Sequence, residues 1–122
     1  MTRVDFIRRG GRFCGLVATG HSGYGEAGSD IVCAAVSTAV GMAEIAIRDV
    51  AKVPASVEVD EETATVRLLL PDSMTAEQRL VCESALQSAY LELRENAGPY
   101  RAYLRVRQVN ARHFETEEKN NA

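Results

Sequence analysis

The sequence predicts an α+β fold, a single domain in which two helices pack on one face of a five-stranded, mostly antiparallel sheet. Five short segments rich in apolar and β-branched residues alternate between two faces, as strands do, and two longer segments repeat apolar residues at helical spacing. In chain order they read ββαββαβ. The length of 122 residues is typical of one compact domain. We expect that domain at residues 1–111, followed by a polar, frayed tail at residues 112–122.

The strands are expected at residues 3–9, 12–19, 56–60, 64–70 and 101–108. Gly10 and Gly11 separate the first two strands, which predicts a hairpin turn. Because side chains alternate along a strand, one face of the sheet packs on the helices and the other is polar. That polar face either stands in water or meets a second copy of the chain. The residues expected on it are Glu58, Arg67, Tyr103, Arg105 and Arg107.

The helices are expected from residue 31 to about 52 and from residue 75 to about 96. Ser29 or Asp30 caps the start of the first helix. Its first half is apolar on nearly every side, so we expect that half to be largely buried. Ser73 is the expected N-cap of the second helix, and Gly98 with Pro99 ends it.

Composition and charge indicate a cytoplasmic globular protein. The net charge of -3 gives no broad attraction to nucleic acid, and we expect no direct nucleic-acid partner. The N-terminal residues lack the apolar core of a signal peptide, and no apolar run approaches the ~18 residues of a membrane span, so we expect no membrane association. The three cysteines, Cys14, Cys33 and Cys82, are an odd number, which favours free thiols in a reducing compartment.

Cys33 differs from the other two cysteines because it opens a helix directly after a glycine-rich loop. If Asp30 is the N-cap, Cys33 lies in the first helical turn, where backbone N–H groups have no intrahelical acceptor. These donors and the helix macrodipole favour the thiolate, the nucleophilic form of cysteine. The Asp30 carboxylate opposes this effect if it lies close, so its better role is to cap the helix or to orient an imidazole. The alternative for Cys33 is a buried, small hydrophobic side chain, which is what we expect for Cys14 and Cys82.

His21 is one of two histidines, and it lies where a strand ends and the glycine loop begins. A base at a strand end can face a helix N-terminus across a loop and serve as base and then acid. The alternative is a loop histidine without a role. Ser37 lies one turn after Cys33, so its hydroxyl either hydrogen-bonds near the sulfur or bonds the carbonyl one turn back.

The loop at residues 20–29, GHSGYGEAGS, contains four glycines and is long for a connection in so small a domain. Its glycines either let a substrate backbone approach closely or only provide turns. The phosphate-binding pattern GxxxxGK[ST] is absent, and so are CxxC and HExxH. We therefore expect neither a metal nor another cofactor.

The stretch from Gly20 to Ser37 resembles the signature of the ribosomal-processing cysteine protease family, called Prp. That signature is Gly-His, a glycine-containing loop, and Asp-[Ile/Val]-[Val/Leu]-Cys-[Ala/Ser]-x-[Val/Ile/Leu]-Ser. The matching residues are Gly20, His21, Gly28, Asp30, Ile31, Val32, Cys33, Ala34 and Ser37. The order of elements and the chain length resemble the family as well. Ser22 departs from it, because many members have alanine there.

The resemblance implies a catalytic dyad of Cys33 and His21, supported by Asp30 and Ser37. It also implies removal of the N-terminal extension of a large-subunit ribosomal protein, and a homodimer. The oxyanion of the reaction would be held by N–H groups at the helix start or by loop amides. The implied substrate loop, which moves when substrate arrives, contains Gly20, Ser22, Gly23, Tyr24, Gly25 and Gly28.

Two alternatives to the protease remain at this point. One is a non-enzymatic, ribosome-associated binding module that uses the loop and the arginine-bearing sheet face, which the negative net charge argues against. The other is a thiol redox enzyme, which lacks a resolving cysteine near Cys33.

Overall fold

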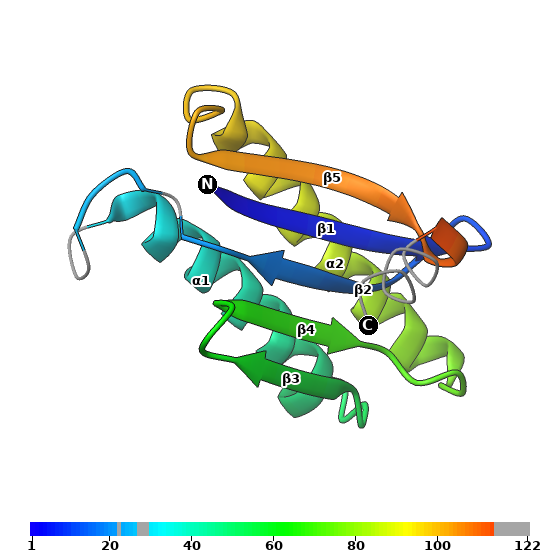
Figure 1. Cartoon of the computed structure of the whole chain (residues 1–122). Helices are drawn as coiled ribbons and strands as arrows, with labels where there is room; N and C mark the ends of the chain where they lie inside the picture. The colour runs from blue at the N-terminus through cyan, green and yellow to red at the C-terminus, as the bar shows by residue number, and fades with distance from the viewer. Residues whose placement is uncertain (22, 27–29, 114–122) are drawn as a thin grey trace.

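The computed structural model describes residues 1–21, 23–26 and 30–113. Both helices lie behind one five-stranded sheet in Figure 1, so the predicted fold class and element order are confirmed. The elements are β1 (Thr2–Arg9), β2 (Arg12–Thr19), α1 (Ile31–Ile45), the π-helical η1 (Ala46–Val50), β3 (Ser56–Asp60), β4 (Thr65–Leu69), α2 (Ala76–Ala97) and β5 (Leu104–Asn110).

The sheet is mixed, with the strand order β3-β4-β2-β1-β5. Neighbours pair antiparallel except β5, which runs parallel to β1 because α2 carries the chain back across the sheet. Gly10 and Gly11 form the predicted turn with φ of 58° and 80°, a conformation that glycine adopts without strain. This order brings the end of β2 and the starts of β1, β4 and β5 to one end of the sheet, where the glycine loop begins (Figure 1).

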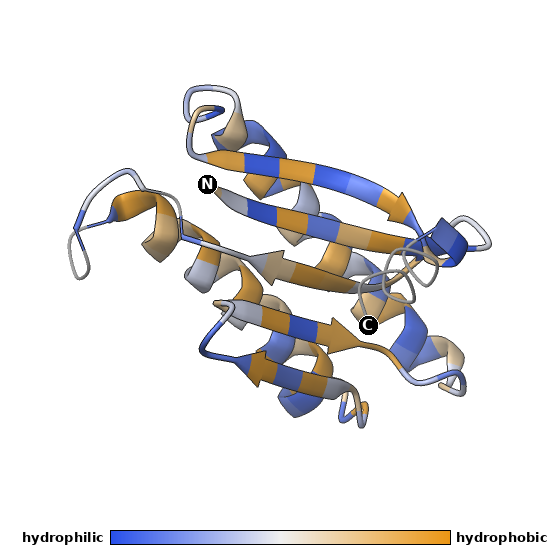
Figure 2. Cartoon of the chain, viewed as in Figure 1, coloured by the Kyte–Doolittle hydropathy of each residue, from blue (hydrophilic) through white to orange (hydrophobic). Residues whose placement is uncertain are grey.

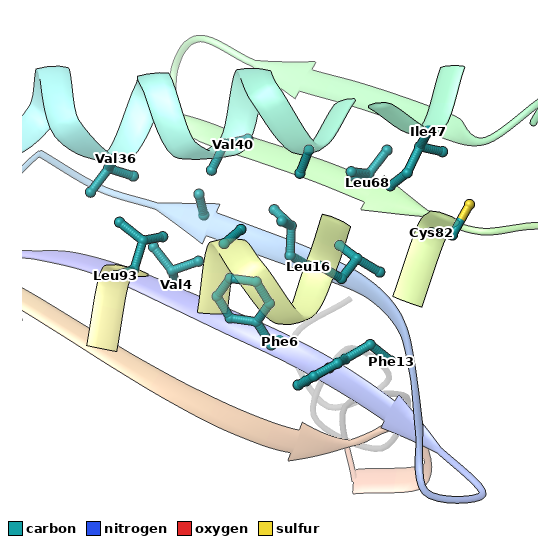
Figure 3. Close-up of a cluster of buried hydrophobic side chains, with 14 of the residues drawn as sticks. Val4, Phe6, Phe13, Leu16, Val36, Val40, Ile47, Leu68, Cys82 and Leu93 are labelled. Carbon is teal, nitrogen blue, oxygen red and sulfur yellow. The ribbon is translucent and has the colours of Figure 1, made fainter. Parts of the chain in front are cut away.

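The core lies between the sheet and the helices (Figure 3). Val4 and Phe6 project from β1 toward the helices, and they meet side chains from β2, β4, α1 and α2. Each fully buried aliphatic side chain of this kind stabilises the fold by roughly 1.5–3 kcal/mol relative to its exposed state. The other large side chains labelled in this core are Phe13, Leu16, Val36, Val40, Ile47, Leu68 and Leu93. Helix α1 is therefore anchored along its length, which fixes the position of its first turn.

The expectation that the first half of α1 is largely buried is wrong. Only one stripe, which includes Val32, Val36 and Val40, packs into the core. Ile31, Met42 and Ile45 point away from it and are 53%, 67% and 55% exposed. Figure 2 shows the first half of this helix mostly in the hydrophobic colour, and its exposed polar side chains there are those of Ser37 and Thr38. The sequence pattern cannot separate a helix buried on all sides from one whose outer apolar face lacks a partner in the single chain.

The expectation that no apolar segment is long enough to span a membrane is wrong for α1 and η1 taken together. The segment Ile31–Val50 is the one described helix that is long and apolar enough to cross a membrane by length and composition alone. Core helices of globular proteins pass the same test, and this segment contributes Val36, Val40 and Ile47 to the core.

Several element boundaries differ from the prediction by one or more residues, and three of these differences have a clear cause. Helix α2 is capped by Thr75 rather than Ser73, because Thr75 forms a reciprocal capping box with Gln78. The first helix stops short of residue 52, since Ala46–Val50 is π-helical and Lys52 has a φ of 56°. Strand β5 begins at Leu104 instead of residue 101, and Tyr103 belongs to the turn before it, packed against the core.

The four charged residues assigned to the outer face of the sheet lie on it, as predicted. That face is not polar throughout, because Ile7 and Val17 form a small buried apolar cluster on it with Ala111. The strand registers place Glu58 opposite Arg67 and Arg105 opposite Arg3, all on the side away from the helices. At its centre Asp5 is 4% exposed and accepts two hydrogen bonds from the Arg107 guanidinium, at 2.9 and 3.0 Å. This bidentate pair satisfies a buried carboxylate and joins β1 to β5.

Candidate active site

The candidate site begins at Gly20, which ends β2 and directs the chain toward α1. The Gly20 amide donates to the Ala64 carbonyl at 2.9 Å, and its own carbonyl accepts from the Thr2 hydroxyl at 3.3 Å. Its φ is 88°, and a Cβ at this position would lie 2.6 Å from the Met1 carbonyl oxygen. Only glycine fits this conformation and this close backbone approach, so Gly20 fixes where His21 emerges.

Asp30 caps α1, and Cys33 occupies the third helical position, as the sequence predicts. The Asp30 Oδ1 atom accepts from the amides of Val32 and Cys33, each at 3.0 Å. Its Oδ2 atom accepts from the Gly25 amide at 3.2 Å. One carboxylate therefore fixes both the start of the helix and one point of the glycine loop. The Cys33 side chain is half-buried.

Two cavities open on the same three side chains. One, of about 520 Å³, lies under the glycine loop and is lined by His21, Cys33 and Ser37 together with Gly23 and Asp30. The other, of about 360 Å³, also contains His21, Cys33 and Ser37 in its wall, and it extends toward the β3–β4 hairpin. The predicted nucleophile and base thus lie at the junction of two neighbouring hollows. A bound chain can cross such a junction with the reactive thiol beneath it.

The second cavity contains residues that the sequence analysis missed. Val59 and Asp60 of β3 and Thr65 and Val66 of β4 form its far wall. They reach the site because β4 pairs with β2, so that Thr65 lies opposite Thr19, two residues before His21. This pairing joins residues far apart in sequence, and no local pattern around Cys33 indicates it.

Ser37 lies where predicted, one turn after Cys33 and on both cavity walls. Within the described ranges its hydroxyl forms no hydrogen bond, so the bond to the carbonyl one turn back is not formed. The hydroxyl therefore remains available to a group that enters either cavity.

The helix start is largely excluded as the oxyanion hole. The amides of Val32 and Cys33 already donate to Asp30, and the Ala34 amide donates to the Asp30 carbonyl at 3.1 Å. The sequence analysis gave two possible sets of oxyanion donors, the amides of the helix start and the amides of the loop. Because the cap already uses the helix-start amides, the loop amides are the set that remains available.

Tyr24 attaches the glycine loop to the turn before β5. Its ring makes edge-to-face contacts with Tyr100 and Tyr103, with centroids 5.5 and 5.1 Å apart. Sequence reasoning placed Tyr24 in the substrate loop but missed its two partners, for which the spacing of two tyrosines just after a helix gives only a weak signal. Ser22 and Gly28 of the predicted loop lie outside the described residues.

The other two cysteines line neither of the two cavities that contain Cys33 and His21. Cys82 is fully buried in the core, and this burial raises the pKa of its thiol. Cys14 is half-buried at the far end of the sheet. Among the residues with described positions, no three His, Cys, Asp or Glu side chains gather as a metal site.

Residues 1–105 match the sequence family described as Cysteine protease Prp, and this match covers most of the chain. The chain belongs to the Prp family. It is therefore a cysteine protease, which removes the non-enzymatic binding module and the thiol redox enzyme as alternatives. No curated protein sequence matches the chain.

Solved structures share the fold of this chain. The ribosomal processing protease Prp of Staphylococcus aureus with a covalently linked product peptide is 24% identical, with a TM-score of 0.76 over 89% of this chain and 100% of that one. The same protease with a substrate peptide is 21% identical, with a TM-score of 0.74 and the same coverage. SMU.848 from Streptococcus mutans is 27% identical, with a TM-score of 0.75 over 90% of this chain and 95% of that one.

Proposed function

We propose that this Prp-family protease uses Cys33 as nucleophile and His21 as base to remove the N-terminal extension of a large-subunit ribosomal protein. One observation carries the dyad. Cys33 and His21 together line two neighbouring cavities, and neither Cys14 nor Cys82 lines either of them. The S. aureus relative is a ribosomal processing protease that binds substrate and product peptides, which supports the substrate class.

The chemistry needs one proton carrier and one thiol. His21 takes the proton of the Cys33 thiol, and the sulfur attacks the carbonyl carbon of the scissile bond. The tetrahedral intermediate collapses as the imidazolium gives its proton to the leaving amine, which departs with its new N-terminus. Water, deprotonated by His21, then attacks the remaining thioester and releases the second product. The proton returns to the Cys33 sulfur, so the enzyme is regenerated.

The oxyanion of both tetrahedral intermediates is held by loop amides. Asp30 occupies the amides of Val32 and Cys33, as described above. Gly23 lines the loop cavity beside Cys33, and its amide has no hydrogen bond to a described residue. Its φ of 73° is a conformation in which glycine places its amide without strain. An oxyanion donor on the loop also explains how loop movement on substrate arrival would complete the site.

Asp30 and Ser37 support the dyad from opposite sides of the thiol. Asp30 positions Cys33 through the helix start and restrains the loop through Gly25. Ser37 lines the same cavity as Cys33, and its hydroxyl has no hydrogen bond to a described residue. The substrate backbone, entering that space, is the partner that fits this hydroxyl.

We also propose that the protease works in the cytoplasm as a homodimer, paired through the outer side of its helices. Ile31, Met42 and Ile45 lie on one side of α1, where they are exposed. Beside them, a groove of about 360 Å³ between α1 and α2 is lined largely by alanine, with Met42 at its edge. A second copy is the occupant that this surface fits, since a two-fold axis places the methionine of each chain against the groove of the other.

The dyad is tested by incubating the purified protein with a peptide that spans the N-terminal extension and reading the products by mass. Cys33→Ala and Cys33→Ser should both retain the fold and lose cleavage entirely. Cys14→Ser, which removes a half-buried thiol away from the site, is the matched control and should cleave normally. Alkylation of the native enzyme should modify Cys33 and stop the reaction, whereas buried Cys82 should stay unmodified. Full cleavage by either Cys33 variant would remove the nucleophile assignment.

A further inference from the structure

A cavity of about 630 Å³ lies at the end of the sheet opposite to the dyad. It is formed by the β1–β2 hairpin, the segment after β4 and the start of α2, which meet far from the glycine loop in Figure 1. It shares no lining residue with the two cavities of the dyad. Its volume falls in the range of sites for small molecules, about 300–1,000 Å³.

The walls of this distal cavity carry a surplus of positive charge. Arg9, Arg12 and Arg79 line it, and Asp72 is its one carboxylate among the described residues. The guanidinium groups of Arg12 and Arg79 form no hydrogen bond or ion pair with any residue in the described ranges. The neighbouring Arg8 differs, because its guanidinium donates to the Gln108 side chain at 2.7 Å and to the Gly11 carbonyl at 2.6 Å. Like charges that line one hollow repel each other, and an anion between them would relieve this repulsion.

The inner part of the same cavity is apolar. Phe13 lines it and is held in place by ring contacts with Phe6 and Tyr90, at centroid distances of 6.0 and 5.8 Å. Leu70 and Met74 complete this floor. A flat, weakly polar ring packs well against such a surface, since thioether and guanidinium groups both make favourable contacts with aromatic faces.

We propose that the distal cavity is a binding site for a nucleoside phosphate, with the phosphate on Arg12 and Arg79 and the base on the floor formed by Phe13 and Met74. A phosphate carries up to two negative charges and three acceptor oxygens, so it satisfies several guanidinium groups where a single carboxylate would not. A free mononucleotide and a nucleotide within an RNA strand present the same chemistry to these residues. The site is separate from peptide cleavage and does not depend on the dyad.

The test measures binding by calorimetry at low ionic strength, where charge interactions are least screened. The probes are adenosine monophosphate, adenosine, inorganic phosphate and an eight-nucleotide RNA. The double variant Arg12→Gln/Arg79→Gln removes the two unpaired charges. The matched control Arg101→Gln/Arg105→Gln removes two exposed charges that do not line the cavity. Circular dichroism verifies that both variants are folded.

Saturable binding of the monophosphate, at least about tenfold weaker in the cavity variant and unchanged in the control, is the expected result. The monophosphate should also bind more tightly than adenosine or inorganic phosphate alone, because it uses both halves of the site. Binding of the RNA with the same loss in the cavity variant, and none of the monophosphate, would support the site and assign its ligand to a strand. No binding of either, or equal weakening in both double variants, would overturn the proposal.

Discussion

Asp30 positions Cys33 through the backbone at the start of α1. The amides of Val32 and Cys33 donate to its carboxylate, which fixes the first helical turn. The same carboxylate occupies those amide donors, so they are not available to a developing anion. The helix start therefore positions Cys33 more than it activates it. In the proposed dyad, activation of the Cys33 thiol therefore falls to His21.

Removing the Asp30 cap should cost activity beyond its cost in stability. Asp30→Ala should lower the free energy of unfolding by about 1 kcal/mol, the usual contribution of an N-cap. It should also lower kcat/KM at least about tenfold, since it frees Gly25 and the helix start together. The measurements are urea unfolding and peptide cleavage.

Thr75→Ala is the matched control for that variant, because Thr75 caps α2 away from the site. It should lose a similar free energy of unfolding and keep its kcat/KM. Equal kcat/KM values in the two variants would show that the cap of α1 has no special part in the reaction.

At this scale the sequence predicts what is local. Asp30, Cys33 and Ser37 lie within two helical turns, so their spacing alone places them on one helix start. The contact of Asp30 with Gly25 and the ring contacts of Tyr24 with Tyr100 depend on how a loop folds back. No periodic pattern constrains a loop rich in glycine, so these partners were not predictable.

At the scale of elements, the glycine loop is held by Tyr24 as well as by the bond from Gly25 to Asp30. The ring of Tyr24 packs edge-on against Tyr100 and Tyr103 in the turn that leads into β5. Two such ring pairs are worth roughly 0.5–1.5 kcal/mol each beyond the area they bury. The contact sets a modest cost on any movement of the loop away from that turn.

Tyr24→Ala should separate binding from chemistry. Loss of the ring contacts frees the loop, so KM for the peptide should rise several-fold while kcat changes less. Hydrogen exchange of the amides at residues 23–26 should become faster in this variant.

Tyr24→Phe keeps the ring and removes only the hydroxyl, so it should behave like the unaltered enzyme. If Tyr24→Ala leaves both KM and loop exchange unchanged, the ring contacts do not restrain the loop.

The ends of elements were harder to predict than their existence. Thr75, and not Ser73, caps α2, because Thr75 and Gln78 form a reciprocal pair of hydrogen bonds. Residues 101–103 form a turn instead of the predicted start of a strand, because Tyr103 packs inward, against the core and Tyr24. Alternation of side chains is compatible with both outcomes, and tertiary packing decides between them.

The whole molecule has an apolar surface on its helical side that one chain alone does not cover. Met42 and Ile45 of α1 are more than half exposed there, next to the alanine-lined groove between the helices. A single chain loses the hydrophobic stabilisation that burial of this surface would provide. The proposed homodimer recovers it.

Charge placed on that surface should separate the two copies. Met42→Glu/Ile45→Glu should shift the molecular mass in solution, measured by sedimentation or light scattering, from two chains to one. Val59→Glu adds a charge at an exposed apolar residue of β3 on another part of the molecule, and it should leave the mass unchanged. A single-chain mass for the unaltered protein would overturn the homodimer.

Strand order was the part of the whole fold that the sequence left open. The alternation within β1, β2, β4 and β5 predicts which face of each strand is buried, but not which strand lies beside which. The parallel pairing of β5 with β1 and the pairing of β4 with β2 join segments that are distant in the chain. Those two pairings bring Thr65 and Tyr103 close to the candidate site. The position of these two residues therefore follows from the strand order and not from the local sequence.

The close contact of Gly20 with the first residue of the chain has a practical consequence for handling the protein. The Met1 carbonyl lies against Gly20, and Thr2 bonds both the Gly20 and the Tyr103 carbonyls. Thr2 also lines a cavity that contains Cys33 and His21. A purification tag fused before Met1 would therefore emerge beside Cys33, in space that the proposed substrate needs. Recombinant enzyme should carry its tag elsewhere or have it removed before any kinetic measurement.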